Sequence, residues 1–257
     1  MNRRTQGFFV LPVLAAVLMM LAAAPAGAQD QSKFRLGFTI EHFSRELSWN
    51  DDAEMSKSQN NLFAARAEIV ASPGLVFDFT AGFSLSGFNG LVFDTLPISL
   101  DYEAGGAPGL FLGAGLRGRF FRSGDFEIEG TARFVYSFKL SKTWTLEDFS
   151  VPATATGGPT WMRVTVGPRF LYHASDKVTP YLSVSADWFS GHFEIAEDIG
   201  DLSGQEKKKV KGKGMADIAL GLDYRISNKV TLRAEAGFLP YSGGVDTALS
   251  VGFLYNF

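Results

Sequence analysis

The chain has 257 residues, with 24 Lys and Arg against 27 Asp and Glu, and it contains no cysteine. A formal net charge of −3 gives no broad basic field, which argues against a nucleic-acid-binding protein. The lack of cysteine excludes a disulfide framework and a lipid anchor attached to a thiol. The 28 glycines and 24 phenylalanines are an unusual combination, because glycine weakens strands that phenylalanine favours, and together they indicate strongly curved sheets.

The N-terminal segment has the order of charge, apolar run and small residues that is typical of a secretory signal peptide. Arg3 and Arg4 precede the uncharged residues 8–24, and small residues follow up to Ala28. We predict export through the Sec pathway with cleavage after Ala28, which makes 1–28 the leader and 29–257 a single mature domain. The mature chain then has 22 basic residues (24 minus two arginines) against 27 acidic ones. No later apolar run approaches the length of a membrane-crossing helix.

Ten segments of the mature chain alternate between apolar and polar residues with the two-residue period of a β-strand. They cover about 34–42, 62–71, 75–85, 110–121, 126–140, 161–172, 182–188, 215–226, 230–238 and 247–257. Charged side chains fall on one face of these segments and essentially none on the other. A water-soluble β-sandwich would give the same alternation, so alternation by itself does not distinguish a sandwich from a transmembrane barrel.

The connections between the segments separate these two folds. They are short after the second, fourth, sixth and eighth segments and long at 44–61, 86–109, 141–160 and 193–214. This asymmetry is typical of an outer-membrane barrel with short periplasmic turns and long extracellular loops. Residues 91–103 also resemble a strand, but they would make the number odd and Pro97 interrupts them, so we assign them to the second outer loop. The prediction is ten strands, with eight as the alternative.

Aromatic residues at the segment ends predict two girdles at the membrane interfaces. The predicted girdles are Phe120, Phe126, Tyr172, Tyr181, Tyr224 and Phe257 toward the short turns, and Trp144, Trp161, Trp188 and Tyr241 toward the long loops.

The last eight residues, 250–257, combine Ser250, Gly252, Tyr255 and a terminal Phe257. This pattern resembles the C-terminal signal of bacterial outer-membrane barrels, which implies insertion by the barrel-assembly machinery. With the leader and the ten segments, the chain is similar to the family of small bacterial outer-membrane β-barrel proteins (the outer membrane protein beta-barrel domain family). The resemblance implies an all-β fold, a closed antiparallel up-and-down barrel, located in the outer membrane.

The charged face of the segments is predicted to line the lumen of this barrel. The candidates for ion pairs there are Arg66, Glu68, Arg117, Arg119, Glu127, Glu129, Arg133, Arg163, Arg169, Asp217, Asp223, Arg225, Arg233 and Glu235. A ten-stranded barrel has an interior little wider than its own side chains require. We therefore expect interleaved ion pairs, either in a packed, barely hydrated lumen or around a small polar pore.

The fourth long connection contains a run of lysines that forms a candidate polyanion-binding loop. Its cations are Lys207, Lys208, Lys209, Lys211 and Lys213. They could hold the phosphates of lipopolysaccharide or an acidic polymer, and the alternative is a solvated, flexible loop.

Ser190, His192 and Glu194 share one face at the outer end of the seventh segment. These are the residue types of a nucleophile, a base and an orienting carboxylate, but their order and spacing do not match the lipid A deacylases, so we assign no catalytic residue. No cofactor or metal is predicted. We expect a monomeric structural or surface-interaction protein that contacts outer-membrane lipids and lipopolysaccharide. A narrow channel for small hydrophilic or amphipathic solutes and a lipid-modifying hydrolase are the alternatives.

Overall fold

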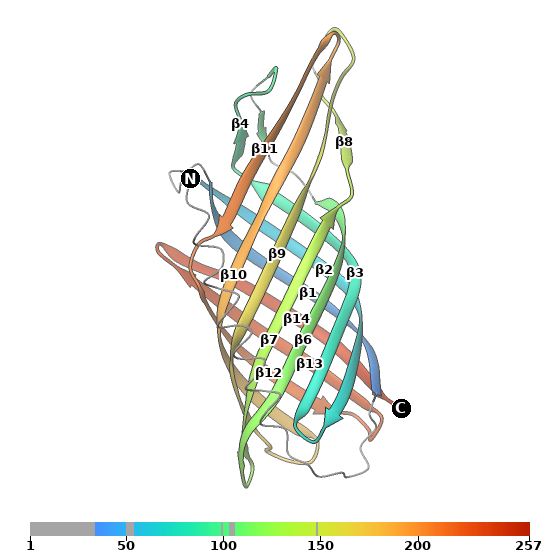
Figure 1. Ribbon diagram of the computed structural model, residues 1–257, viewed down its shortest axis with the longest axis vertical. Helices are drawn as coiled ribbons and strands as arrows, with labels where there is room; N and C mark the ends of the chain where they lie inside the picture. Colours follow the sequence, from blue (N-terminus) through green and yellow to red (C-terminus); the bar gives the residue numbers. More distant parts are fainter. Residues whose placement is uncertain (1–33, 50–53, 99, 103–105, 148) are drawn as a thin grey trace.

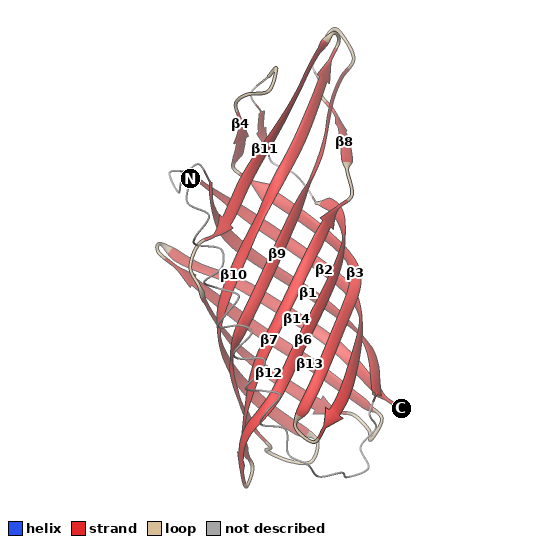
Figure 2. Ribbon diagram, viewed as in Figure 1, coloured by secondary structure: helices blue, strands red, loops and turns tan. Residues whose placement is uncertain are grey.

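The computed structural model describes residues 34–49, 54–98, 100–102, 106–147 and 149–257 (Figure 1). Every helix or strand drawn in this part of the chain is a β-strand (Figure 2). No helix among these residues has the length and apolar character that crossing a membrane requires. The predicted signal peptide and its cleavage site lie outside the described residues.

Ten antiparallel strands form a continuous ring. Each strand pairs with the next, and the last pairs with the first, where Phe38 lies opposite Phe253. This confirms ten strands rather than eight. The ring consists of β1 (Phe34–Trp49), β2 (Glu54–Ser72), β3 (Leu75–Asn89), β6 (Ala107–Ser123), β7 (Phe126–Lys139), β9 (Ala153–Tyr172), β10 (Val178–Ile199), β12 (Ala216–Arg225), β13 (Val230–Tyr241) and β14 (Gly244–Asn256).

Four further strands lie at the end of the barrel opposite the short turns (Figure 1). β4 (Leu91–Phe93) and β5 (Leu100–Tyr102) form a separate two-stranded sheet, which confirms that residues 91–103 stay outside the ring. β8 (Lys142–Thr145) pairs with β9. β11 (Leu202–Gly212) pairs with β10 along its length and also meets β1. The upper parts of β9 and β10, with β11 and β8, rise well above the rest of the ring and form an extension of the barrel.

Three of the four predicted long connections are mostly strand rather than loop, because the strands continue through them. Most of residues 44–61 belongs to β1 and β2, most of 141–160 to β8 and β9, and most of 193–214 to β10 and β11. The backbone ladder continues between these strands, which satisfies the polar backbone groups that a loop would expose. The alternation of side chains continues as well, and it buries Leu47, Phe193 and Val210. The lysine run is therefore part of a strand.

The two faces of the wall differ as a transmembrane barrel requires. Phe134 and Leu220 are 44% and 58% exposed on the outside, whereas Glu68 and Asp187 are fully buried on the inside. Two predicted girdle residues are an exception, because Trp161 and Tyr181 are buried in the lumen. Each shares the parity of the inward-facing residues of its strand, and parity decides the facing of a side chain regardless of its type.

Candidate functional site

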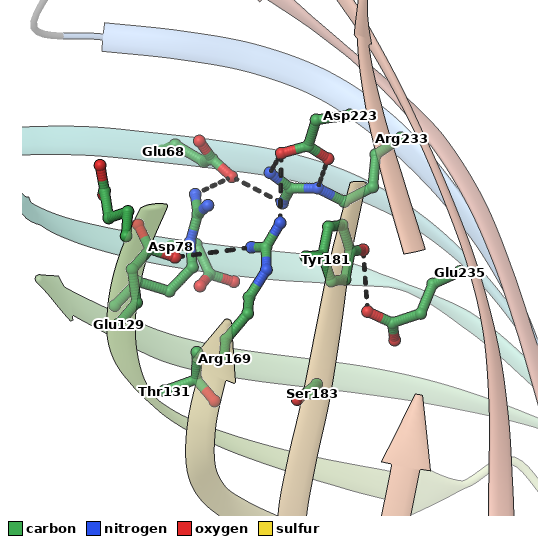
Figure 3. A network of polar contacts seen from close by, with 12 residues as sticks. Glu68, Asp78, Glu129, Thr131, Arg169, Tyr181, Ser183, Asp223, Arg233 and Glu235 are labelled. Atoms are coloured by element: carbon green, nitrogen blue, oxygen red, sulfur yellow. Dashed lines mark hydrogen bonds and ion pairs between the residues drawn. The ribbon is translucent and has the colours of Figure 1, made fainter. Parts of the chain in front are cut away.

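The interior of the barrel near the short turns holds a connected group of arginines and carboxylates, which we call the ionic layer (Figure 3). Glu68 is fully buried and accepts ion pairs from four arginines. The distances are 2.6 Å to Arg117, 3.1 Å to Arg66, 3.4 Å to Arg35 and 3.5 Å to Arg233. These five side chains come from β1, β2, β6 and β13, so the carboxylate ties together strands from different parts of the ring.

The same layer continues through Asp223, which receives both Nε (2.7 Å) and Nη2 (2.8 Å) of Arg233. Arg169 donates to Asp223 at 3.2 Å and places its guanidinium 3.5 Å from the centre of the Tyr181 ring. The Tyr181 hydroxyl donates to Glu235 at 2.9 Å (Figure 3). Tyr181 lies opposite Gly221 in the ladder, and any side chain at 221 would collide with the Tyr181 ring.

A second charged group lies further from the short turns and centres on Arg163. Its guanidinium contacts three carboxylates, Asp187 at 2.6 Å, Glu41 at 3.1 Å and Asp217 at 3.1 Å. Arg133 also reaches Glu41, at 2.7 Å. The Arg163 guanidinium lies 4.7 Å from the centre of the Phe43 ring, which belongs to a group of hydrophobic residues further out.

Beyond Phe43 the interior contains a large group of hydrophobic side chains, which we call the apolar cluster, beside a smaller number of buried polar residues. Trp161 stacks on Phe189 with 5.5 Å between ring centres and meets Phe43 edge-on at 5.6 Å. The Trp161 indole N–H donates to Ser86 at 3.0 Å, so its polar atom is satisfied. The cluster comprises Phe43, Leu47, Trp49, Leu62, Ala64, Phe88, Leu91, Phe93, Leu96, Phe111, Val135, Ala155, Trp161, Phe189, Phe193, Ile195 and Val210.

The loop that contains β4 supplies the top of this cluster and is held there by polar contacts. Thr95 donates to Glu206 through its backbone N–H (2.8 Å) and its hydroxyl (2.7 Å). The backbone N–H of Ile98 donates to Glu197 at 3.2 Å. Burial raises the pKa of Glu197. Burial also acts to raise the pKa of Glu206, but hydrogen bonds from Thr95 and Lys208 outweigh it and lower that pKa.

The lysine run has two faces because it lies on β11. Lys208 points inward, where its ammonium contacts Glu206 and Asp94, each at 2.9 Å. Lys207, Lys209 and Lys211 are exposed on the opposite face. Three of the predicted polyanion-binding residues therefore share one outward surface, which we call the lysine face.

The sequence profile of the family described as "Outer membrane protein beta-barrel domain" matches residues 13–257. This chain belongs to that family. Membership and the fold place the protein in the bacterial outer membrane, with the short turns in the periplasm and the extension outside the cell.

Solved structures with the same architecture have low sequence identity to the chain. The outer membrane protease OmpT from Escherichia coli has a TM-score of 0.54 and 8% identity, covering 90% of this chain and 99% of that one. The translocator domain of the autotransporter NalP from Neisseria meningitidis has a TM-score of 0.48 and 12% identity, covering 96% and 98%. An outer membrane channel from Pseudomonas putida F1 has a TM-score of 0.41 and 10% identity, covering 91% and 99%. No curated protein matches the chain. At 8% identity, the similarity to OmpT shows a shared fold only.

The structure brings nearly all of the predicted lumen residues into contact with a partner. Arg66, Glu68, Arg117, Arg119, Glu127, Glu129, Arg133, Arg163, Arg169, Asp217, Asp223 and Arg233 make ion pairs. Glu235 is bound by Tyr181 instead, and Arg225 makes no ion pair within the described part of the chain while it lines a cavity near the short turns.

The sequence analysis missed Arg45 and the apolar cluster. Arg45 is 1% exposed, donates to the carbonyl of Gly214 at 2.6 Å and lies 3.5 Å from Asp187. It falls in the predicted first loop, where no facing could be assigned. The available signal was that Phe43, Arg45 and Leu47 continue the inward parity of Glu41 beyond the predicted strand end.

The residues of the hydrolase hypothesis lie on the outer face of β10. Among the described residues, no hydrogen bond joins Ser190, His192 and Glu194 to one another. Glu194 pairs with Lys139 at 2.5 Å and also accepts a hydrogen bond from Gln205. The Lys139 hydrogen bond lowers the pKa of Glu194, and burial with the nearby Lys207 lowers the pKa of His192. In the part of the chain that the structure describes, no group of histidines and carboxylates is placed to hold a metal ion.

The residues of the predicted assembly signal lie on β14 and at its end. The backbone N–H of Phe257 donates to the carbonyl of Phe34 at 3.3 Å, so the last residue extends the closing seam of the ring. Its ring is 67% exposed and meets Tyr255 edge-on with 5.1 Å between centres. Gly252 lies opposite Thr39, and Ser250 lines a small internal cavity.

Proposed function

We propose that this protein is a non-enzymatic surface barrel with a sealed lumen, and that it acts through its extracellular extension. The observation that carries the proposal is the apolar cluster, in which Trp161, Phe189 and Phe193 are each at most 5% exposed and belong to a packed group of rings. A porin would keep a polar, hydrated lumen along its whole length. The extension is built from paired strands with a buried core, as a rigid binding surface requires.

Planar-bilayer recording separates this proposal from the narrow-channel alternative. The folded protein is expected to give no stable unitary steps in a symmetric salt solution. Reproducible steps of uniform size from protein whose folding is verified by heat-modifiable gel migration would contradict a sealed lumen.

The finer part of the proposal is that the lysine face binds phosphate groups of lipopolysaccharide in the surrounding leaflet. Trp188 on β10 is one of the residues predicted for the outer aromatic girdle, and Lys211 lies opposite Ser190, two residues beyond it. Lys209 and Lys207 follow at steps of about 7 Å along the strand. The three ammonium groups thus begin at the height where the hydrocarbon of the leaflet gives way to its phosphorylated headgroups.

The surroundings leave this face positive. Glu194 is the acidic neighbour of Lys207 in the ladder, but its two oxygens are occupied by Lys139 and Gln205. Lysine is a flexible point charge that suits phosphates whose positions are not fixed. A strand also presents the three charges at lower entropic cost than a flexible loop would.

The lysine face can be tested by measuring the lipopolysaccharide that stays bound to the purified barrel through a detergent wash. At about 1 kcal/mol for each lysine, replacing Lys207, Lys209 and Lys211 together by glutamine should weaken retention on the order of a hundredfold. The matched triple replacement by arginine keeps the charges and should keep the lipid. Equal retention by the glutamine and wild-type proteins would reject this partner. Loss of lipid with retained binding of a soluble polyanion would assign the face to a polymer.

The absence of enzymatic activity is part of the same proposal and has its own test. Replacing Ser190 by alanine should leave the number of acyl chains on lipid A unchanged, as read by mass spectrometry of cells with and without the protein. A change that depends on Ser190 would favour the lipid-modifying hydrolase.

Assembly by the barrel-assembly machinery is also proposed, from the residues at the end of β14. Deleting Phe257 should lower the fraction of folded, heat-modifiable protein in the outer membrane severalfold, while Phe126→Ala at the same interface should not. Phe126 is a suitable control because its ring is also more than half exposed at the short-turn end. Normal folding of the protein without Phe257 would contradict the proposed role of this residue.

A further inference from the structure

The periplasmic end of the lumen holds a cavity of about 480 Å³, which we call the vestibule. It lies between the ionic layer and the short turns, inside the ring of strands, so the wall of the barrel separates it from the bilayer. Cations outnumber carboxylates in its lining. The cations are Arg35, Arg117, Arg119, Lys177, Arg225 and Arg233, and the carboxylates are Glu127, Glu129, Asp176 and Asp223.

Most of the vestibule carboxylates are already shared among several cations. Glu127 lies within 4 Å of Arg119 (3.7 Å), Arg122 (3.8 Å) and His173 (3.2 Å). Asp223 is held by Arg233 and Arg169, and Arg169 also takes Glu129, at 3.7 Å. Glu68, beside the lining, pairs with Arg35, Arg117 and Arg233. Among the lining carboxylates only Asp176, on the turn before β10, makes no ion pair with a residue that the structure describes.

Several cations of the vestibule therefore have few ion-pair partners or none. The backbone N–H of Arg225 donates to the carbonyl of Lys177 at 2.7 Å, so these two residues lie side by side across the β10–β12 ladder. Neither side chain makes an ion pair with another described residue. Arg35, on the other side of the cavity, has a single ion pair, at 3.4 Å, with a carboxylate that three other arginines share.

Neighbouring like charges in a partly enclosed cavity repel one another more strongly than they would in bulk water. An oxyanion between them would remove this repulsion and use the free N–H donors. Guanidinium groups present a planar fork that matches a carboxylate or a phosphate. We propose that the vestibule binds a small periplasmic anion that carries carboxylate or phosphate groups, as a site separate from the extracellular surface.

The test is isothermal titration of the full folded protein in a neutral detergent, with inorganic phosphate in one arm and citrate in the other. Binding is expected in at least one arm, and the arm that binds more tightly identifies the preferred oxyanion. Replacing Lys177 and Arg225 together by glutamine should weaken binding at least about tenfold, because each removes a charged hydrogen-bond donor. Heat-modifiable migration verifies that the variant is folded.

Lys229→Gln is the matched control. Lys229 lies on the next periplasmic turn, with its ammonium 5.9 Å from the centre of the Tyr255 ring, and it does not line the vestibule. This variant should bind as the wild type does. The proposal would be overturned if the wild type bound neither phosphate nor citrate. It would also be overturned if the Lys229 variant lost as much affinity as the double variant, since anions would then be binding to surface charge in general. Neither result bears on the sealed lumen or on the lysine face.

Discussion

The outer and the periplasmic halves of the lumen use the same alternating strands but are filled in opposite ways. The outer half contains aromatic and aliphatic side chains in direct contact, with Trp161 at its centre. The periplasmic half contains ion pairs around Glu68 and Arg163, beside internal cavities of about 150 and 480 Å³. One strand can contribute to both halves, since Trp161 and Arg163 are successive inward-facing residues of β9.

The difference shows what each half needs in order to be stable. The outer half, which includes β4 and the β10–β11 hairpin, has a hydrophobic core like that of a soluble protein. Buried charges there are held by specific partners, as Glu206 is by Thr95 and Lys208. The periplasmic half is open to water through the vestibule, which lowers the cost of keeping charges inside, and buried carboxylates such as Glu68 and Glu41 are held by more than one arginine. Four predictions test this contrast.

The largest effect is expected from Arg163→Met. It would leave Glu41, Asp187 and Asp217 facing one another without their shared cation, and breaking a buried ion pair in this way costs about 3–5 kcal/mol. Urea unfolding in lipid vesicles, followed by heat-modifiable migration, measures the change. Arg122→Met is the control, because Arg122 is 54% exposed in its side chain and should lose less than about 1 kcal/mol. Equal losses of unfolding free energy in the two variants would mean that the buried ion pairs of Arg163 stabilise the barrel no more than an exposed pair does.

The outer half is tested by Leu47→Ala, for which we expect a loss of about 3 kcal/mol from lost burial and the cavity that remains. Leu47 is fully buried in the apolar cluster. Leu112→Ala removes the same atoms from a residue that is 56% exposed on the lipid side, so it should cost clearly less. If the two variants unfold at the same urea concentration, the outer half is not a packed core.

A smaller effect is expected from Tyr181→Phe in the periplasmic half. It removes a hydrogen bond to the carboxylate of Glu235 and keeps the ring under Arg169, and the cost is about 1.5 kcal/mol. Tyr224→Phe serves as the control, because the Tyr224 ring lies on the outer face of the barrel. The same unfolding assay gives the answer, and a Tyr181 variant as stable as wild type would show that water replaces the bond without loss.

The smallest effect concerns pH and the loop that caps the outer half. The folded pKa of Glu206 is below its ordinary value of 4.5. The stability that Glu206 gives to the folded protein is therefore present above pH 4.5 and is lost as pH falls through the folded pKa. Glu197 has a raised pKa in the folded protein. The stability that it gives is therefore fully present below pH 4.5 and is lost as pH rises through the folded pKa. Hydrogen exchange of the Thr95 and Ile98 amides should therefore respond to acid in opposite directions. Glu206→Gln should remove the response at Thr95, and a response that survives this change would assign it to another group.

Much of the fold could be predicted from the sequence, because strand facing depends only on parity and on the type of neighbouring residues. The ten strands and the outward facing of Phe134 and Leu220 follow from that local pattern. The exclusion of residues 91–103 needed Pro97 and the even number of strands in a closed ring, because their local pattern resembles a strand. The errors share one cause. Residues 44–61 and 193–214 contain many polar residues, among them Ser, Asn, Asp and Gly, which also favour turns. Their pairing partners are supplied by other strands that composition does not identify.

The sequence by itself determined which side chains point into the lumen and which point to lipid, because both depend on a two-residue period along one strand. Only the tertiary structure decided what meets inside. Arg163 and Glu41 are 122 residues apart, and their contact depends on the register of strands around the whole ring. The division of the lumen into an outer half with a hydrophobic cluster and an inner half with ion pairs and cavities was decided in the same way, because it depends on which residues of distant strands meet inside the ring.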